Sequence, residues 1–237
     1  WHVELCLRYG IDMVWIGART SVNPFSIQEI AAVLKGTSLG VLVKNPVNPD
    51  INLWTGVIER VAAAGIDKLM AVHRGFNVLE SKIFRNVPLW EIPIELKRRI
   101  PELPLLCDPS HIGGKPDLLR QVAQHAIDLD MDGLMIESHN DPVHALTDAQ
   151  QQITPDQLRE LIGSLTIRSS ASVPGDPMEQ LQQLRQKIDQ TDHQILELLA
   201  RRMELAGEIG TYKKNHGMTI LQIKRWRNIL QDRMDKA

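Results

Sequence analysis

Residues 104–111 read Pro-Leu-Leu-Cys-Asp-Pro-Ser-His, an apolar run that ends in a cluster of polar residues. The same pattern recurs in four other segments, Met13-Val14-Trp15-Ile16-Gly17-Ala18-Arg19-Thr20, Val41-Leu42-Val43-Lys44-Asn45-Pro46, Leu69-Met70-Ala71-Val72-His73-Arg74-Gly75 and Leu134-Met135-Ile136-Glu137-Ser138-His139. Short, continuously apolar runs are typical of strands that are buried on both faces of a parallel sheet. Polar residues at the carboxyl end of one strand after another are typical of the active-site face of an α/β barrel.

Helix signals separate these apolar runs. Helices are expected at residues 27–34, 54–64, 91–99 and 118–129. Another opens at Thr154, a predicted N-cap that is followed by Pro155 in the first turn. The alternation predicts an α/β fold with about five of the eight strand–helix units of a TIM (β/α)8 barrel. We therefore expect a partial barrel, in a fragment whose other units precede Trp1. A five-stranded open sheet is the alternative, although its apolar edges would be exposed.

The chain changes character after residue 167. Residues 168–177 are turn formers and small polar residues without an apolar period, which indicates a linker. From Leu181 to Tyr212, apolar residues at alternating spacings of three and four predict a long helix that packs along a partner helix. We expect a barrel domain at 1–167, the linker at 168–177 and an all-α helical domain at 178–237.

Composition narrows the class of protein. The 237 residues carry 27 basic and 29 acidic side chains, a net charge of −2. No overall field therefore attracts nucleic acid or a membrane, and no apolar run approaches the roughly 20 residues that cross a bilayer. The two cysteines, Cys6 and Cys107, have no CxxC spacing, which favours a reduced, cytoplasmic protein.

Two sets of side chains at the predicted strand ends point to chemistry. His111, Glu137 and Asp148 offer an imidazole and two carboxylates, a set that suits a divalent metal ion of the Mn, Fe, Co or Zn class. The alternative is that Asp108 and His111 only cap a turn and that Asp148 N-caps the stretch after it.

Three cations follow consecutive predicted strands: Arg19, Lys44 and Arg74. A guanidinium grips phosphate bidentately, and an ammonium serves as a point charge for carboxylate or phosphate. Three cations at one barrel mouth repel each other unless an anion lies between them. The alternative is that they are structural side chains in salt bridges.

The barrel motifs resemble those of the metal-dependent 3-deoxy-D-arabino-heptulosonate 7-phosphate (DAHP) synthases. The resemblance spans residues 1–167 and rests on six ordered motifs, Gly17-Ala18-Arg19-Thr20, Lys44-Asn45-Pro46, His73-Arg74-Gly75, Asp108-Pro109-Ser110-His111, Ile136-Glu137-Ser138-His139 and Thr147-Asp148-Ala149. It implies a TIM barrel that condenses phosphoenolpyruvate with erythrose 4-phosphate in aromatic amino-acid biosynthesis. By this resemblance, Arg19 and Arg74 hold the phosphate of phosphoenolpyruvate with the backbone N–H near Ala18, and Lys44 meets its carboxylate. The same resemblance makes His111, Glu137 and Asp148 the metal ligands, with Lys44 and His111 as catalytic residues.

The chain also departs from that family. The family's fourth metal ligand, a cysteine on the first strand, and its Lys-Pro-Arg-Thr motif are both absent, and Cys107 does not match that cysteine. We therefore expect this chain alone to be impaired as an enzyme. The sister 3-deoxy-octulosonate 8-phosphate synthase, which uses arabinose 5-phosphate, is an alternative that the helical tail argues against.

Arg202 interrupts the apolar seam of the tail, where an unpaired buried charge is costly. Lys213 lies about three helical turns further on, near the same face. Arg185 lies on a different side, so that it could reach the same site only from another helix or another protomer. On this pattern alone, the alternative is a coiled-coil dimerisation tail with a snorkelling arginine.

The tail resembles the first long helix of the all-helical chorismate mutases, through Leu184-Arg185-Gln186-Lys187-Ile188-Asp189, Leu198-Leu199-Ala200-Arg201-Arg202-Met203-Glu204-Leu205-Ala206 and Ile209-Gly210-Thr211-Tyr212-Lys213. This implies a homodimer that rearranges chorismate to prephenate. By it, Arg202 and Lys213 are catalytic and bind substrate together with Arg185 from a partner chain, and Arg225 is a further binding cation.

The mutase motifs are incomplete. Trp226 stands where the family usually has a glutamate, Gln222 replaces a common aspartate, and the third helix does not follow. We therefore expect low or lost mutase activity. The alternative is a non-catalytic tail that dimerises and senses chorismate or prephenate to regulate the barrel.

Overall fold

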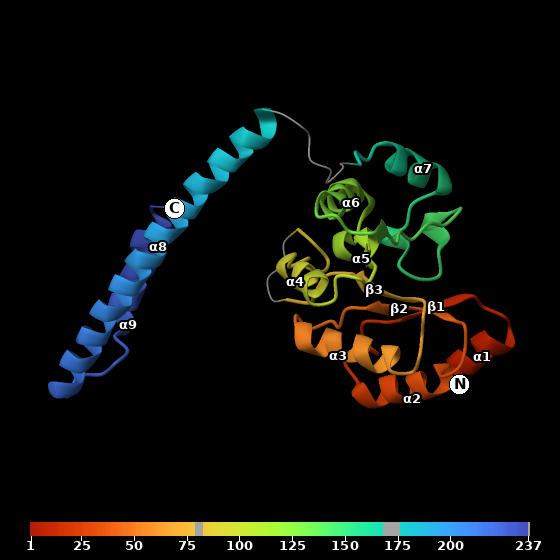
Figure 1. Ribbon diagram of the computed structural model, residues 1–237, viewed down its shortest axis with the longest axis horizontal. Coiled ribbons are helices and arrows are strands. Elements are labelled where there is room, and N and C mark those ends of the chain that lie inside the picture. Colours follow the sequence, from red (N-terminus) through yellow and green to blue (C-terminus); the bar gives the residue numbers. More distant parts are fainter. Residues whose placement is uncertain (79–82, 168–175, 237) are drawn as a thin grey trace. The chain divides into compact units, whose positions relative to one another are not determined.

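The computed structural model describes residues 1–78, 83–167 and 176–236 (Figure 1). The chain divides into two compact units, Trp1–Ser170 and Ala171–Ala237. Most of the predicted linker, residues 168–175, lies outside the described residues. The exact domain limits that the sequence suggests therefore stay a prediction.

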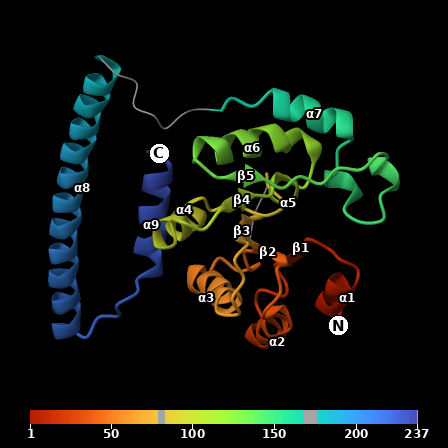
Figure 2. The ribbon, with the colours of Figure 1, turned by 45° about the vertical axis from the view of Figure 1, so that its right-hand side comes forward.

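A five-stranded parallel sheet forms the centre of the first unit (Figure 2). Its strands are β1 (Met13–Ile16), β2 (Gly40–Lys44), β3 (Leu69–His73), β4 (Leu105–Cys107) and β5 (Gly133–Leu134). Each strand pairs with the strand that follows it in the chain. A doubly wound sheet reverses its strand order at a switch point, whereas consecutive strands of a barrel keep chain order. The order is therefore that of consecutive barrel units, as the sequence predicts.

Helices follow each strand. In the first unit they are α1 (His2–Arg8), α2 (Pro24–Leu34), α3 (Ile51–Ala62), α4 (Glu91–Arg99), α5 (Pro109–Gly113), α6 (Leu119–Asp128) and α7 (Pro155–Gly163), with the 3-10 helices η1 (Pro116–Leu118), η2 (Pro142–His144) and η3 (Ala149–Gln151). Contacts join α1 to α2, α2 to α3 and α3 to α4. Because successive helices touch, they lie on one side of the sheet, as in the outer layer of a barrel.

The core lies between the sheet and these helices. Val41 and Val43 of β2 are fully buried, and so are Ile27 of α2 and Trp54 of α3. The Trp54 indole N–H donates to the backbone oxygen of Val43 over 3.3 Å, so that its one polar group is satisfied inside the core. This packing fixes the carboxyl end of β2, where Lys44 begins the polar cluster.

Local capping explains where the helices begin. Asn23 accepts hydrogen bonds from two backbone N–H groups, and α2 therefore begins at Pro24, three residues earlier than the apolar pattern suggests. Thr154 forms a capping box with Gln157, as expected for α7.

The last strand is shorter than predicted. Met135 lies beyond β5, although its N–H still donates to the Cys107 carbonyl over 2.7 Å.

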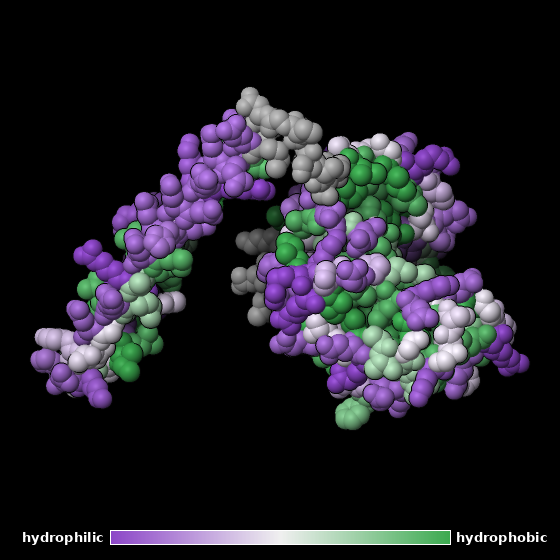
Figure 3. Space-filling view, in the orientation of Figure 1, coloured by the Kyte–Doolittle hydropathy of each residue, from purple (hydrophilic) through white to green (hydrophobic). Residues whose placement is uncertain are grey.

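The described part of the second unit, residues 176–236, consists of two helices, α8 (Asp176–Asn215) and α9 (Ile223–Met234). The long helix that the spacing predicts is therefore present. Its apolar seam is exposed within the single chain, with Leu184, Ile188 and Ile195 all about half exposed. Figure 3 shows apolar patches among the hydrophilic surface of this unit. Among the residues described, no helix is both long and apolar enough to cross a membrane.

The Asp50 cap of α3 offers a test of this local account. Its Oδ1 accepts from the N–H groups of Asn52 and Leu53 over 2.9 and 3.0 Å. We expect Asp50→Ala to lower the free energy of unfolding by about 1 kcal/mol, because two N–H groups lose their acceptor. Urea denaturation measures the change. Asp50→Asn keeps an oxygen acceptor and should lose less, and equal stability of the alanine variant and the parent would contradict the account.

Candidate functional site: a cationic cluster beside a His–Glu–Asp triad

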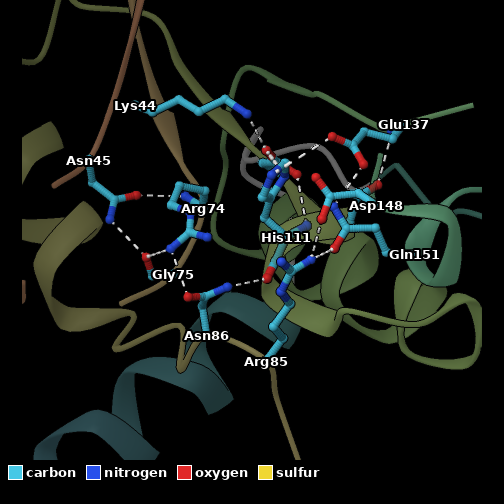
Figure 4. Close-up of polar contacts among 12 residues, drawn as sticks. Lys44, Asn45, Arg74, Gly75, Arg85, Asn86, His111, Glu137, Asp148 and Gln151 are labelled. Carbon is cyan, nitrogen blue, oxygen red and sulfur yellow. Dashed lines mark hydrogen bonds and ion pairs between the residues drawn. The ribbon is translucent and has the colours of Figure 1, made fainter. Parts of the chain in front are cut away.

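The candidate site lies at the carboxyl ends of the five strands (Figure 4). The predicted residues occupy successive positions: Arg19 after β1, Lys44 at the end of β2, Arg74 after β3, His111 on α5 after β4, Glu137 after β5, and Asp148 before η3. Carboxyl ends of neighbouring parallel strands share one edge of the sheet, so distant parts of the chain meet there.

The proposed metal ligands converge. One ligand atom from each of His111, Glu137 and Asp148 lies within 4.8 Å of the others. All three side chains are partly exposed, and the His111 Nε2 lies 3.8 Å from Oε1 of Glu137. On its other side, Nδ1 of His111 lies 2.8 Å from Oδ2 of Asp108. A ring nitrogen facing a carboxylate while the other faces the ion is the usual surrounding of a metal-binding histidine. The donor set thus fits a divalent ion, and the ligand roles stay a prediction.

Asp108 is the buried centre of the site. Its Oδ2 lies 2.8 Å from the Lys44 Nζ, and both side chains are almost fully buried. Its Oδ1 accepts from the His111 backbone N–H over 3.0 Å. Asp108 therefore caps α5, as the alternative interpretation holds, but the same carboxylate also meets the His111 ring.

The charge of Asp108 depends on these neighbours. Burial raises the pKa of the Asp108 carboxyl, but the His111 hydrogen bond and the Lys44 charge outweigh burial and leave that pKa below its ordinary value. Asp108 is therefore ionised at neutral pH, and its charge balances the buried ammonium of Lys44.

Arg74 is held beside Asp108 without an ion pair to any described carboxylate. Its Nη1 donates to Oδ1 of Asn86 over 2.7 Å, and its backbone N–H donates to Oδ1 of Asn45 over 2.6 Å. The next residue, Gly75, has a φ of +75°, and a Cβ there would lie 2.7 Å from the Asn86 carbonyl oxygen. Only glycine fits at this close approach.

The cations lie close enough to affect one another. Burial lowers the pKa of Arg74, and the nearby charges of Arg85 and Arg19 lower that pKa further, while Asp108 opposes them. Arg19 is exposed and has no hydrogen bond or ion pair with the residues described. Among the residues described, the salt-bridge alternative therefore holds for Lys44 but not for Arg19 or Arg74. Ala18 is half-buried next to Arg19.

His73 precedes Arg74 and is fully buried. Its ring packs against Trp90, Phe76 and Trp54, with centroid distances of 5.2, 5.7 and 6.4 Å. Burial lowers the pKa of His73 to about 3, so that the ring is neutral near pH 7. His73 is a packed core residue that supports the strand end.

Three residues of the site were missed by reasoning from strand ends. Arg85 donates from Nη1 to Oδ1 of Asp148 over 2.7 Å, and Asp148 makes no cap hydrogen bond to η3. Asp148 thus occupies the N-cap position of η3, but capping does not account for its carboxylate. Arg85 also donates to Gln151, whose Nε2 donates to Oε2 of Glu137 over 2.7 Å. Asn86 is the third of these residues, because it accepts from Arg74 and donates to the His111 carbonyl. Arg85 and Asn86 lie in a loop and Gln151 ends the short helix η3, segments without an apolar period, so no sequence signal marked them.

The predicted mutase residues lie on the second unit. At a rise of about 1.5 Å per residue, Arg185 and Arg202 are about 25 Å apart along α8, and Lys213 is about 16 Å beyond Arg202. Lys213 donates from Nζ to the Ile220 carbonyl over 2.8 Å. Arg225 is exposed on α9. The three α8 cations are thus spread along the helix, and one helix does not bring Arg185 to the others.

The buried pair of Asp108 and Lys44 generates a stability test. We expect Asp108→Asn to lower the free energy of unfolding by about 3 kcal/mol, because it leaves the Lys44 charge buried and unpaired. Chemical denaturation measures the loss. The control is Asp156→Asn, because Asp156 pairs with Arg159 on the surface and such a pair contributes about 0–1 kcal/mol. Equal losses in both variants would contradict the account.

The same pair has a defined pH dependence. The folded pKa of Asp108 is lowered, so its stabilisation is complete above the unfolded pKa of about 4 and is lost as the pH falls through the folded pKa. The stability difference between the parent and Asp108→Asn should therefore shrink in acid. Denaturation curves at a series of pH values check this, and a difference that stays constant into strong acid would refute it.

Two family profiles match the chain. Residues 6–168 match the profile of the DAHP synthetase I family, and residues 184–237 match that of chorismate mutase type II. The resemblances stated from the motifs are thereby confirmed at the level of the two families.

Individual relatives agree. The chain is 29% identical to the phospho-2-dehydro-3-deoxyheptonate aldolase of Thermotoga maritima over 151 residues, which are 64% of this chain and 43% of that protein. It is 39% identical to the T-protein of Haemophilus influenzae over 60 residues, 25% of this chain and 16% of that protein. A solved truncated form of the Thermotoga maritima 3-deoxy-D-arabino-heptulosonate 7-phosphate synthase superposes with a TM-score of 0.60 at 27% identity, covering 68% of this chain and 59% of that one. The chain thus spans less than two thirds of each relative's length.

With the family profile matched over most of its residues, the chain belongs to the DAHP synthetase I family and carries a chorismate mutase type II segment at its C-terminal end.

Proposed function

We propose that the barrel unit serves the condensation of phosphoenolpyruvate with erythrose 4-phosphate, which gives DAHP and phosphate in aromatic amino-acid biosynthesis in the cytoplasm. One observation carries the proposal: Arg19 and Arg74, which have no carboxylate partner among the described residues, lie on the same sheet edge as the triad of His111, Glu137 and Asp148. Two neighbouring guanidinium groups without a described carboxylate partner favour an anion between them, and phosphate fits the geometry of two such groups.

In this proposal, the chain's own residues bind and orient phosphoenolpyruvate. Arg19 and Arg74 hold its phosphate, with the backbone N–H near Ala18 as a further donor. Lys44 meets its carboxylate. The ammonium has three N–H donors and uses one on Asp108, so that two stay available for the substrate. Asp108 keeps the Lys44 chain extended and fixes where those donors point.

The triad supports the second half of the reaction. His111, Glu137 and Asp148 would hold a divalent ion of the Mn, Fe, Co or Zn class, which would polarise the aldehyde oxygen of erythrose 4-phosphate as a Lewis acid. The residues on either side would bring the methylene carbon (C3) of phosphoenolpyruvate to that aldehyde carbon. After the carbon–carbon bond forms, water adds to C2, the carbon that carries the phosphate ester, and phosphate leaves from C2.

For the second unit, we propose a homodimeric chorismate-binding domain that converts chorismate to prephenate. The half-exposed apolar seam of α8 supports a helical partner. Arg202, Lys213 and Arg225 would meet Arg185 of the partner subunit around the substrate carboxylates and ether oxygen. The rearrangement needs no nucleophile, because positioning and charge stabilisation account for the rate.

Sensing without turnover is a second candidate for this unit. Trp226 and Gln222 replace polar groups that the mutase motif usually supplies, and the Lys213 ammonium is already hydrogen-bonded to the Ile220 carbonyl. Such a domain would still bind chorismate or prephenate through its cations and would regulate the barrel.

Binding of phosphoenolpyruvate tests the barrel proposal. We expect Arg19→Met to weaken binding by ten- to a hundredfold, because a hydrogen bond to a charged group contributes about 1.5–3 kcal/mol. Calorimetric titration measures the constant, and Arg74→Met should act in the same direction. The control is Arg120→Met, because Arg120 bonds Ser164 outside the site. Equal binding by the parent and both site variants would contradict the proposal. With arabinose 5-phosphate in place of erythrose 4-phosphate, product formation would indicate the sister octulosonate chemistry.

Chorismate separates the two candidates for the helical unit. We expect this chain to bind chorismate but to turn it over slowly. Trp226 cannot accept a hydrogen bond from the substrate hydroxyl, as a glutamate would. Loss of chorismate absorbance measures turnover, and equilibrium binding is measured in parallel. Arg202→Met should abolish binding, and Arg201→Met, one position away on the same helix, is the matched control. Rapid turnover by the parent would contradict the expectation.

A further inference from the structure

Loop residues tie the three predicted metal ligands together. Arg85 and Asn86 lie between β3 and α4, and Gln151 ends η3. None of the three has an atom in the His111, Glu137 and Asp148 donor set, yet each contacts a residue of that set or its backbone. Figure 4 shows Arg85 and Gln151 beside Asp148, and Asn86 between Arg74 and the helix of His111.

The two carboxylates are linked by a continuous chain of hydrogen bonds. Arg85 Nη1 donates to Oδ1 of Asp148 over 2.7 Å and to Oε1 of Gln151, and Gln151 Nε2 donates to Oε2 of Glu137 over 2.7 Å. Gln151 is fully buried, so its amide cannot exchange these bonds for bonds to water. Among the residues described, one oxygen of each carboxylate is thus held and the other accepts no hydrogen bond, which leaves it available to a cation.

Arg85 is itself fixed in place. Gly114 ends α5 with a φ of +68°, and a Cβ on it would lie 2.5 Å from the Arg85 Cβ. The stem of Arg85 therefore packs directly against the end of the helix that carries His111. The neighbouring Asn86 donates from Nδ2 to the His111 carbonyl over 2.6 Å. The segment thus contacts the His111 backbone and the Asp148 carboxylate directly, and it reaches Glu137 through Gln151.

A cation beside a metal site can weaken or strengthen binding of the metal ion. A guanidinium repels a divalent ion, but it also keeps Asp148 ionised and aimed. The geometry decides between them: Arg85 binds one oxygen of Asp148 from outside the triad, and its second bond goes to Gln151. Asp148 also has a φ of +49°, a strained backbone for a non-glycine residue that needs support from its surroundings.

We propose that Arg85 and Gln151 form a clasp that positions Asp148 and Glu137 for the divalent ion, and that this clasp sets the affinity of the chain for that ion. The inference rests on the proposed function, because it takes the triad as the metal site. Arg85 and Gln151 are positioning residues and do not ligate the ion.

Metal titration of the whole chain tests the clasp. We expect Arg85→Met to weaken Co²⁺ and Mn²⁺ binding by about ten- to a hundredfold, the range found when partners of metal ligands are removed. Arg85→Lys keeps the charge but shortens the side chain and loses the planar group whose Nη1 makes both bonds, and should fall between the parent and Arg85→Met. Calorimetry gives the constants, and the visible spectrum of bound Co²⁺ reports the geometry of its ligands. Arg120→Met is the control, because its guanidinium bonds Ser164 away from the triad.

Gln151→Leu supplies the second arm. If Arg85 and Gln151 act as one chain, the double variant should lose little more affinity than either single variant. Should the buried Gln151→Leu fail to fold, the two Arg85 variants carry the test, with thermal unfolding of the metal-free protein as the check on their fold. Metal affinity equal to or above that of the parent in a folded Arg85→Met would overturn the clasp alone. No saturable binding by the parent would overturn both the clasp and the proposed metal site.

Discussion

The site depends on the buried carboxylate of Asp108. It meets the Lys44 ammonium and the His111 ring at 2.8 Å each, and it caps the helix on which His111 lies. A buried charge is tolerated only when partners and hydrogen bonds surround it. Because Asp108 satisfies this condition through residues from two strand ends, it fixes the predicted substrate-binding lysine and the predicted metal ligand relative to each other.

A second link joins the anion-binding and metal-binding parts. Asn86 accepts from the Arg74 guanidinium and donates to the His111 carbonyl, so one amide spans both parts. Phosphate and metal ion would therefore bind to a single connected framework. Such preorganisation is what the proposed condensation of two phosphorylated substrates would require, since the reacting carbons must be held at a defined separation before the bond forms.

Much of this could be predicted from the sequence because of its regularity. Each apolar run contains a strand or the end of one, and the polar residues after it fall on one edge, so Arg19, Lys44, Arg74 and His111 could be placed together before any coordinates. Arg85 and Gln151 could not be placed in this way. Their positions depend on loop conformations, such as the left-handed Gly114 and Asp148, that leave no periodic signal. Arg185 could join Arg202 in one site only from another helix or another protomer. The pattern of a single chain does not specify how such a helix packs.

The central claim is that the cation cluster and the triad form one site. Phosphorus NMR relaxation of phosphoenolpyruvate, measured with Mn²⁺ bound to the chain, tests it most directly, because a paramagnetic ion shortens relaxation only in nuclei close to it. The account predicts strong relaxation enhancement that disappears in Arg19→Met, which retains Mn²⁺ but loses its grip on the phosphate. Saturable binding of both phosphoenolpyruvate and Mn²⁺ without any enhancement would contradict it, because the two would then occupy separate places on the molecule.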